Sequence, residues 1–132
     1  MNAQAVALAK TFNRNVQMGD VTASGLPDNS FEVCAMLEVL EHIDDYEKVL
    51  AEAHRVCASK CVMTVPNIAV LPQMSESQVV PWHMLEATHV NFFTPGSLEK
   101  VLKRYFSRVQ VWEINQWFQP KLYMNIAAVA WK

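Results

Sequence analysis

Residues 31–43 read FEVCAMLEVLEHI. From Phe31 to Leu40 this run is apolar except for Glu32 and Glu38, and a turn-rich segment precedes it. A short apolar run of this kind fits a β-strand that is buried on both faces, although periodicity alone leaves a buried helix open. The acidic and imidazole side chains that end the run are the first candidates for chemistry.

Helical and extended patterns alternate on both sides of this run. They predict a helix at 3–12, a strand at 16–18, a helix that opens at Asp44, a strand at 61–65, a helix that opens at Thr94 and Pro95, and strands at 109–114 and 122–131. Such alternation predicts an α/β fold with a mainly parallel sheet and helices on its faces. The last two strands have no helix between them, so we expect them to pair antiparallel.

Length and composition limit the class of protein. The 132 residues are enough for one domain, so 1–132 is expected to be a single domain, and 52% apolar content excludes a disordered chain. The net charge of −2 argues against non-specific nucleic-acid binding. No apolar run is long enough to span a membrane, and the N-terminus lacks the basic region of a signal peptide, so a cytoplasmic location is expected.

The three cysteines, Cys34, Cys57 and Cys61, are an odd number and form no C-x-x-C pair. This pattern predicts free thiols in a reducing compartment, with neither a disulfide framework nor a zinc knuckle. Their places in and beside apolar segments indicate inert core thiols rather than nucleophiles.

The strongest chemical pattern is Glu38-x-x-Glu41-His42, where the predicted strand ends. If this segment turns helically, the three side chains lie on one face at i, i+3 and i+4. Two carboxylates and an imidazole in that arrangement are half of a divalent-metal site, and His89 could supply a fourth ligand. The alternative is that Glu41 and His42 only cap or pair near a helix start while Glu38 is solvated.

Three other features of the sequence support weaker predictions. Residues 68–82 read as an irregular loop, of a length typical of lids and binding loops. His83, beside this loop, reads as an exposed histidine. Asp20 follows the strand predicted at 16–18, where it is either a turn residue or an acceptor for a ligand hydroxyl or amine.

Several short motifs then follow one another in an order that resembles a known family. They are Gly19-Asp20, Leu26-Pro27, FEV at 31–33, LEVLEHI at 37–43, E-x-x-R-V at 52–56, VPN at 65–67 and HVNFFTP at 89–95. Together they resemble the class I S-adenosylmethionine-dependent methyltransferases. Within that class, the Glu-x-x-Glu-His run looks most like ubiquinone-biosynthesis O-methyltransferases and small-RNA 2′-O-methyltransferases.

The resemblance implies a Rossmann-like methyltransferase sheet and roles for individual residues. Asp20 would lie near the adenine amine of S-adenosylmethionine, and Leu37 and Glu38 would face its methionine part. Glu38, Glu41, His42 and His89 would hold a divalent cation. Glu41, His42 or the cation would deprotonate the acceptor.

The resemblance stops short of the family's glycine-rich G-x-G-x-G turn. The only glycines are Gly19, Gly25 and Gly96, so the match is to the C-terminal two-thirds of the fold, from about Val16 onward. The strands missing from the match would lie beside the strand at 31–39, which leaves an apolar sheet edge open to association. We expect the N-terminal segment or a second chain to cover this edge, with a homodimer as the common solution.

Two hypotheses about function follow. The first is methyl transfer to a hydroxyl of a small molecule, with the cofactor-binding half supplied by another polypeptide or a remodelled dimer. The second is a non-catalytic homo-oligomeric module that binds a small molecule or a protein through residues 68–90. A third reading, an RNA-end methyltransferase, conflicts with the acidic charge balance.

Overall fold

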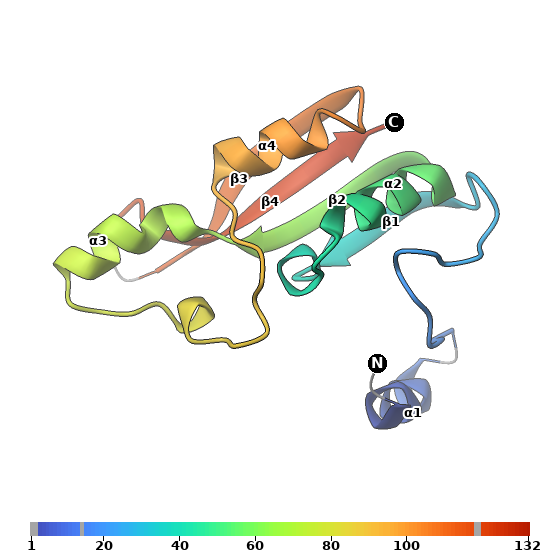
Figure 1. Ribbon diagram of the computed structural model, residues 1–132, viewed down its shortest axis with the longest axis horizontal. Helices are drawn as coiled ribbons and strands as arrows, with labels where there is room; N and C mark the ends of the chain where they lie inside the picture. Colours follow the sequence, from blue (N-terminus) through green and yellow to red (C-terminus); the bar gives the residue numbers. More distant parts are fainter. Residues whose placement is uncertain (1–2, 14, 118–119) are drawn as a thin grey trace.

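The computed structural model describes residues 3–13, 15–117 and 120–132. The described chain forms one four-stranded sheet in the order β1-β2-β4-β3. Its helices and strands are α1 (Ala3–Phe12), β1 (Phe31–Leu37), α2 (Tyr46–Val56), β2 (Cys57–Pro66), α3 (Leu71–Glu76), α4 (Pro95–Leu102), β3 (Arg108–Gln116) and β4 (Tyr123–Trp131) (Figure 1). Three 3-10 turns join them: η1 (Leu40–His42), η2 (Ile68–Val70) and η3 (Trp82–Met84).

The strand directions confirm the predicted α/β sheet. β1 pairs parallel with β2, and β4 pairs antiparallel with both β2 and β3, so three of the four strands run the same way. The β1–β2 register places Cys34 opposite Cys61 and Leu37 opposite Thr64. The chain returns from β1 to β2 through α2, as a parallel pair requires. The C-terminal ends of β1 and β2 therefore lie side by side at the same end of the sheet.

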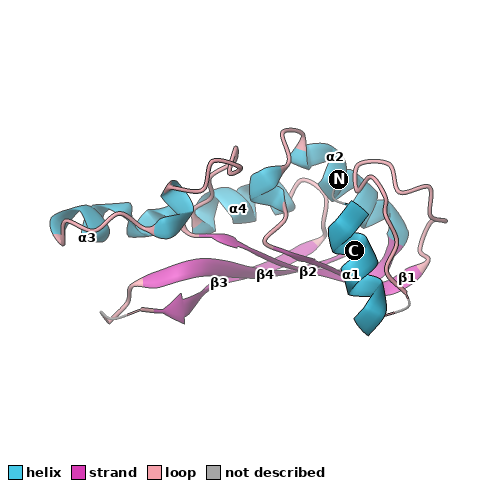
Figure 2. Ribbon diagram, turned by 90° about the horizontal axis from the view of Figure 1, so that it is seen from below, coloured by secondary structure: helices cyan, strands magenta, loops and turns pink. Residues whose placement is uncertain are grey.

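Helices α2, α3 and α4 lie over the same face of the sheet (Figure 2). The core forms between these helices and the strands below them. Burial alternates along β2, so that Cys61, Met63 and Val65 face the helices while the residues between them are partly exposed. The buried helix residues that meet them include Val49, Leu50, Leu98 and Leu102.

The prediction that the 31–40 strand is buried on both faces is wrong. Phe31, Val33 and Leu37 are 45%, 44% and 59% exposed. They are alternate residues on the face that α2, α3 and α4 do not cover, whereas Met36 on the other face is buried. β1 is also the last strand in the sheet order, so one of its sides has no neighbouring strand among the described residues. The open apolar edge expected from the sequence is therefore present.

The N-terminal segment differs from its prediction in part. The predicted helix at 3–12 is confirmed as α1, but it contains no buried residue and stands apart from the sheet (Figure 1). The strand predicted at 16–18 is wrong, since these residues have no regular secondary structure. A three-residue apolar run has too few side chains to hold a strand in place without a partner strand.

Two other local predictions need correction, and one is confirmed. The N-cap of α2 is Asp45 and not Asp44, because the Asp45 side chain accepts a hydrogen bond from the Lys48 amide. Residues 68–82 are more regular than a loop, since they contain η2 and α3. α4 begins as predicted at Thr94 and Pro95. In the described ranges, no helix combines the length and the apolarity that crossing a membrane requires.

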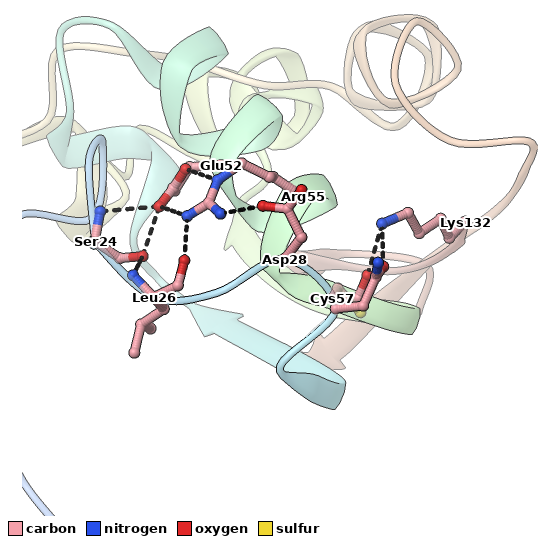
Figure 3. A network of polar contacts seen from close by, with 8 residues as sticks. Ser24, Leu26, Asp28, Glu52, Arg55, Cys57 and Lys132 are labelled. Carbon is pink, nitrogen blue, oxygen red and sulfur yellow. Dashed lines mark hydrogen bonds and ion pairs between the residues drawn. The ribbon is translucent and has the colours of Figure 1, made fainter.

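A polar network fastens the segment before β1 to the outer side of α2 (Figure 3). The carboxylate of Glu52 accepts hydrogen bonds from the Ser24 amide at 2.9 Å and from two guanidinium nitrogens of Arg55 at 2.8 Å. The same guanidinium donates to the Leu26 carbonyl at 2.7 Å and pairs with Asp28. These donors, Arg55 foremost and Ser24 next, lower the pKa of Glu52 to about 2.

We predict that Glu52→Gln destabilises the fold by about 1 kcal/mol at neutral pH, because it removes the charge that these donors face. The native pKa lies below the ordinary value of 4.5, so the stabilisation is complete above that pH and is lost as the pH falls toward 2. Urea unfolding from neutral to acid pH should show the difference between the two proteins shrink over that window.

The control is Glu99→Gln, which removes a carboxylate from the exposed ion pair with Lys103. Its effect should be within about 0.5 kcal/mol. Equal losses in the two variants would show that the network adds nothing to the stability.

Candidate metal centre

The site begins where β1 ends. Glu38 follows β1 with φ of 54°, a left-handed conformation that non-glycine residues adopt at a cost. Its amide donates to the carbonyl and to the hydroxyl of Thr64 on β2, at 3.0 and 3.2 Å. This turn ends the strand and sends the chain directly into η1, which carries Glu41 and His42.

A distant segment is tied to η1 through backbone groups. The carbonyl of Glu41 accepts from the amides of Val90 and Asn91, at 2.8 and 3.1 Å. The side-chain amide of Asn91 donates back to the carbonyls of Leu40 and Ile43, at 3.0 and 2.6 Å. These bonds hold residues 89–91 against η1, so His89 is fixed beside Glu41 although 48 positions separate them in the chain.

Glu41, His42 and His89 form a compact cluster. Each offers a ligand atom, and these atoms all lie within 4.8 Å of one another. Glu41 is fully buried, and neither of its carboxylate oxygens has a hydrogen-bond partner. His42 Nε2 lies 3.8 Å from Glu41 Oε1, and the two imidazole rings meet edge to face with centroids 4.6 Å apart.

Backbone carbonyls orient both imidazoles. His42 Nδ1 lies 3.2 Å from the Thr88 carbonyl, and His89 Nδ1 lies 2.9 Å from the His83 carbonyl. His42 Nδ1 also lies 3.0 Å from the hydroxyl of Thr88. A carbonyl only accepts, so the carbonyl contacts favour a proton on Nδ1 and leave Nε2 as the nitrogen available to a metal. Histidines that bind metals are held in this way, with one nitrogen donating to a carbonyl or carboxylate and the other free as a ligand.

The electrostatics of Glu41 indicate a missing positive charge. Burial raises the pKa of its carboxyl above the ordinary value, its own backbone amide opposes that effect, and the nearby carboxylate of Glu38 adds to it. A buried carboxylate without donors is costly unless a cation compensates it. The orphaned oxygens and the two oriented imidazoles therefore fit a divalent cation.

The other predicted site residues lie outside this cluster. The carboxylate of Glu38 accepts from the Asn125 side chain at 3.0 Å, so the structure pairs Glu38 with β4 rather than with the cluster. Asp20 is exposed and accepts from the amide and the hydroxyl of Thr22, at 2.8 and 2.7 Å, which closes a turn. Leu37 is the exposed last residue of β1.

His83 is placed differently from its prediction as an exposed loop histidine, since it is only 1% exposed. Burial lowers the pKa of its imidazole, and Trp82 packs edge-on against the ring. The sequence reasoning also missed the positioning roles of Thr88 and Asn91. Their only local signal is that they flank His89, and the bonds that define the roles reach residues near position 42.

Comparison with known proteins agrees with this architecture. The family described as a methyltransferase domain matches residues 1–64. No curated protein sequence matches the chain. Among solved structures, a methyltransferase from Thermotoga maritima superposes with a TM-score of 0.74 at 15% identity, over 98% of this chain and 70% of that one. A methyltransferase from Archaeoglobus fulgidus gives 0.66 at 15% identity, over 96% and 72%.

A third solved structure is a complex between a methyltransferase and the Trm112 methyltransferase activator of Haloferax volcanii. It gives a TM-score of 0.75 at 9% identity, over 98% of this chain and 68% of that one. The fold is therefore that of the class I methyltransferases. The family match and these superpositions confirm, at the level of the fold, the resemblance drawn from the sequence.

We predict that Glu41→Gln stabilises the metal-free protein at neutral pH, because it removes a buried uncompensated charge. The native pKa of Glu41 lies above the ordinary value of 4.5, so the wild-type protein loses stability as the pH rises through the native pKa. Urea unfolding with a chelator present should show the advantage of the variant at neutral pH and its loss in acid.

Glu76→Gln is the control, since Glu76 is an exposed carboxylate at the end of α3. It should leave the stability within about 0.5 kcal/mol of wild type at each pH. If Glu41→Gln instead weakens the fold equally at all pH values, the carboxylate is satisfied and the cation argument fails.

Proposed function

We propose that the chain forms the acceptor-binding part of an S-adenosylmethionine-dependent O-methyltransferase, in which Glu41, His42 and His89 hold a divalent cation. The observation that carries this proposal is the buried, unpartnered carboxylate of Glu41 between two imidazoles whose Nδ1 atoms are engaged by carbonyls. One carboxylate and two imidazoles suit a first-row divalent ion and leave coordination positions for an acceptor hydroxyl.

A bound cation would lower the pKa of that hydroxyl and orient it. The chain's own residues divide the remaining work. Glu41 supplies the negative charge at the buried side of the site. The side chain of His42 is 37% exposed, so it lies on the side of the cluster that an acceptor can reach. Because Nδ1 faces the Thr88 carbonyl and Nε2 would hold the cation, the acceptor's proton would leave to solvent. Thr88 keeps that ring in place through the 3.2 Å contact at Nδ1.

The cofactor side of the site is only partly present in residues 1–132. S-adenosylmethionine supplies the electrophilic methyl group, and Asp20, Leu37 and Glu38 are the residues proposed to face it. The three glycines do not form the G-x-G-x-G turn, so these residues alone do not make a complete cradle. We therefore propose that residues 1–132 are one domain, the C-terminal two-thirds of the fold, and that a polypeptide segment outside them completes the cofactor site.

The open edge of β1 supports this division. It presents the apolar side chains of Phe31, Val33 and Leu37 and has no strand partner among the described residues. The solved methyltransferases are longer, since the chain spans 70% and 72% of two of them. In the absence of the completing segment, we propose that a second copy of the chain pairs along this edge.

A small molecule is the proposed acceptor. The net charge of −2 gives no basic surface for a phosphate backbone. Apolar side chains near the cluster remain exposed, among them Trp82 at 56%, Leu85 at 72% and Phe92 at 47%. These side chains are suited to an acceptor with an aromatic or aliphatic body.

We predict that the chain binds one equivalent of Mn²⁺ and that His89→Ala weakens this binding at least about tenfold, because an imidazole ligand is lost. Isothermal titration calorimetry of the full chain measures both affinities. Mn²⁺ is a hard probe that free thiols bind poorly. His54→Ala is the matched control, since His54 lies on α2 outside the cluster, and it should bind Mn²⁺ as the wild type does.

Transfer of the methyl group to a catechol, a small molecule with two adjacent hydroxyls, tests the reaction itself. The chain, together with the segment that completes the cofactor site, should form a methylated product from S-adenosylmethionine only with Mn²⁺ present. Glu41→Gln should abolish formation of this product. If the protein binds neither S-adenosylmethionine nor Mn²⁺ in calorimetry, the non-catalytic module is favoured instead.

We predict that the chain alone is a dimer in light scattering and that Val33→Lys makes it a monomer, because a charge on the open edge opposes strand pairing. Val80→Lys is the matched control: it introduces the same charge at a valine that is 61% exposed, away from β1. This control should remain dimeric. A monomeric wild-type chain would contradict pairing of two copies along β1.

A further inference from the structure

The three cysteines of the chain converge on one point of the β1–β2 pair. Cys34 on β1 is opposite Cys61 on β2, and Cys57 begins β2. The ladder is irregular between them, since Phe31 pairs with Cys57 but Val33 pairs with Lys60. Four residues of regular strand would hold the side chains of Cys57 and Cys61 far apart. The bulge shortens this separation.

The sulfur atoms of Cys34, Cys57 and Cys61 all lie within 4.8 Å of one another. We propose that this thiol cluster is a binding site for a soft, thiophilic cation of the Cu⁺ or Zn²⁺ kind. Thiolate sulfurs bind such ions at about 2.3 Å, so three sulfurs around one ion lie about 4 Å apart. The cluster is therefore within a small side-chain adjustment of the bound geometry.

The ligand type decides which ions fit. Thiolates select soft ions such as Cu⁺ and Zn²⁺, carboxylates take hard ions such as Mn²⁺, and imidazoles take intermediate ones that include Zn²⁺. The thiol cluster shares no residue with the Glu41–His42–His89 cluster, which lies beyond the end of β1. The chain thus presents two separate ligand sets with different preferences.

The thiol cluster is mostly buried, and it borders a cavity at Cys34. Cys57 and Cys61 are fully buried, while Cys34 lines an apolar cavity of about 360 Å³ between β1, α2 and the segment that contains Val21 and Leu26. An ion can therefore enter from the cavity at Cys34. The ammonium of Lys132 donates to the Cys57 carbonyl at 3.0 Å, which places a positive charge beside the negative charge of bound thiolates (Figure 3).

Without metal, the protonated form of Cys34 and of Cys61 is favoured. Burial is the main cause that raises the pKa of Cys34 and of Cys61. The Cys57 thiol donates to the carbonyl of Lys60 at 3.0 Å. Each cysteine that binds the ion must release its proton to solvent, so affinity should rise with pH. This requirement separates a metal site from a cluster of core thiols, which has no reason to lose its protons together.

The test is titration of the reduced protein without oxygen: the full chain with Cu⁺ in one experiment, and the full chain carrying His89→Ala, which impairs the Glu41–His42–His89 cluster, with Zn²⁺ in another. The expected result is saturation at one equivalent, with proton release and protection of the half-buried Cys34 from iodoacetamide, followed by mass spectrometry. The tighter ion identifies the metal, and for Cu⁺ an ultraviolet thiolate-to-metal band should appear. Failure of both ions to saturate, or alkylation at unchanged rates, would overturn the proposal.

Two variants separate this site from the other one. Cys34→Ala changes the half-buried member and should weaken binding of the soft ion at least about tenfold while Mn²⁺ binding is retained. His89→Ala should do the reverse, losing Mn²⁺ and keeping the soft ion. Equal binding of the soft ion by Cys34→Ala and wild type would overturn the three-thiol assignment, and the alkylation of Cys34 in wild type with Cu⁺ needs no variant to fold.

Discussion

The parallel pairing of β1 with β2 is the constraint on which the rest of the structure depends. Its register, with Cys34 opposite Cys61 and Leu37 opposite Thr64, sets where β1 ends. At that end, Thr64 accepts two hydrogen bonds from the Glu38 amide and supports a left-handed turn. A strand pairing shifted by one residue would turn every side chain to the other face and remove both ligand clusters.

Two clusters of different chemistry, each proposed above as a cation site, lie along the same strand pair. The cluster built on Glu41 follows the carboxyl end of β1, which is where α/β sheets bind their ligands. The cluster built on Cys34 and Cys61 lies within the ladder itself and opens to the cavity beside α2. One strand pair can carry both because the strand end exposes polar groups, whereas the ladder presents side chains to the core.

The open edge and the polar network of Glu52 and Arg55 are related features. The network fixes the segment before β1 to α2 through contacts that do not use the edge of the sheet. The edge therefore stays accessible, with Val33 and Leu37 exposed along it. The network therefore uses the segment before β1 and the outer side of α2, whereas the open edge is the free side of β1.

The elements whose signals are local could be predicted from the order of the amino acids. The run at 31–40, the Thr94-Pro95 helix start and the apolar strand at 122–131 were recognisable because turn chemistry, capping and periodicity act over a few residues. The spacing of Glu41 and His42 and the choice of His89 as a further candidate ligand predicted the three side chains that the structure brings together. The start of α2 was predicted at Asp44, one residue before the observed N-cap, because Asp44 and Asp45 have the same side chain.

The placement of the other side chains could not be predicted from the sequence, because this placement depends on contacts between residues far apart in the chain. Glu38 has the right spacing for the cluster, yet Asn125, from a strand 87 positions later, takes its carboxylate. His83 is buried by packing that its loop sequence does not signal. Cys57 and Cys61 are four positions apart, and it is the β1–β2 register that adds Cys34 to them. Strand pairing brings together residues that are far apart in the chain, and no local sequence pattern encodes this pairing.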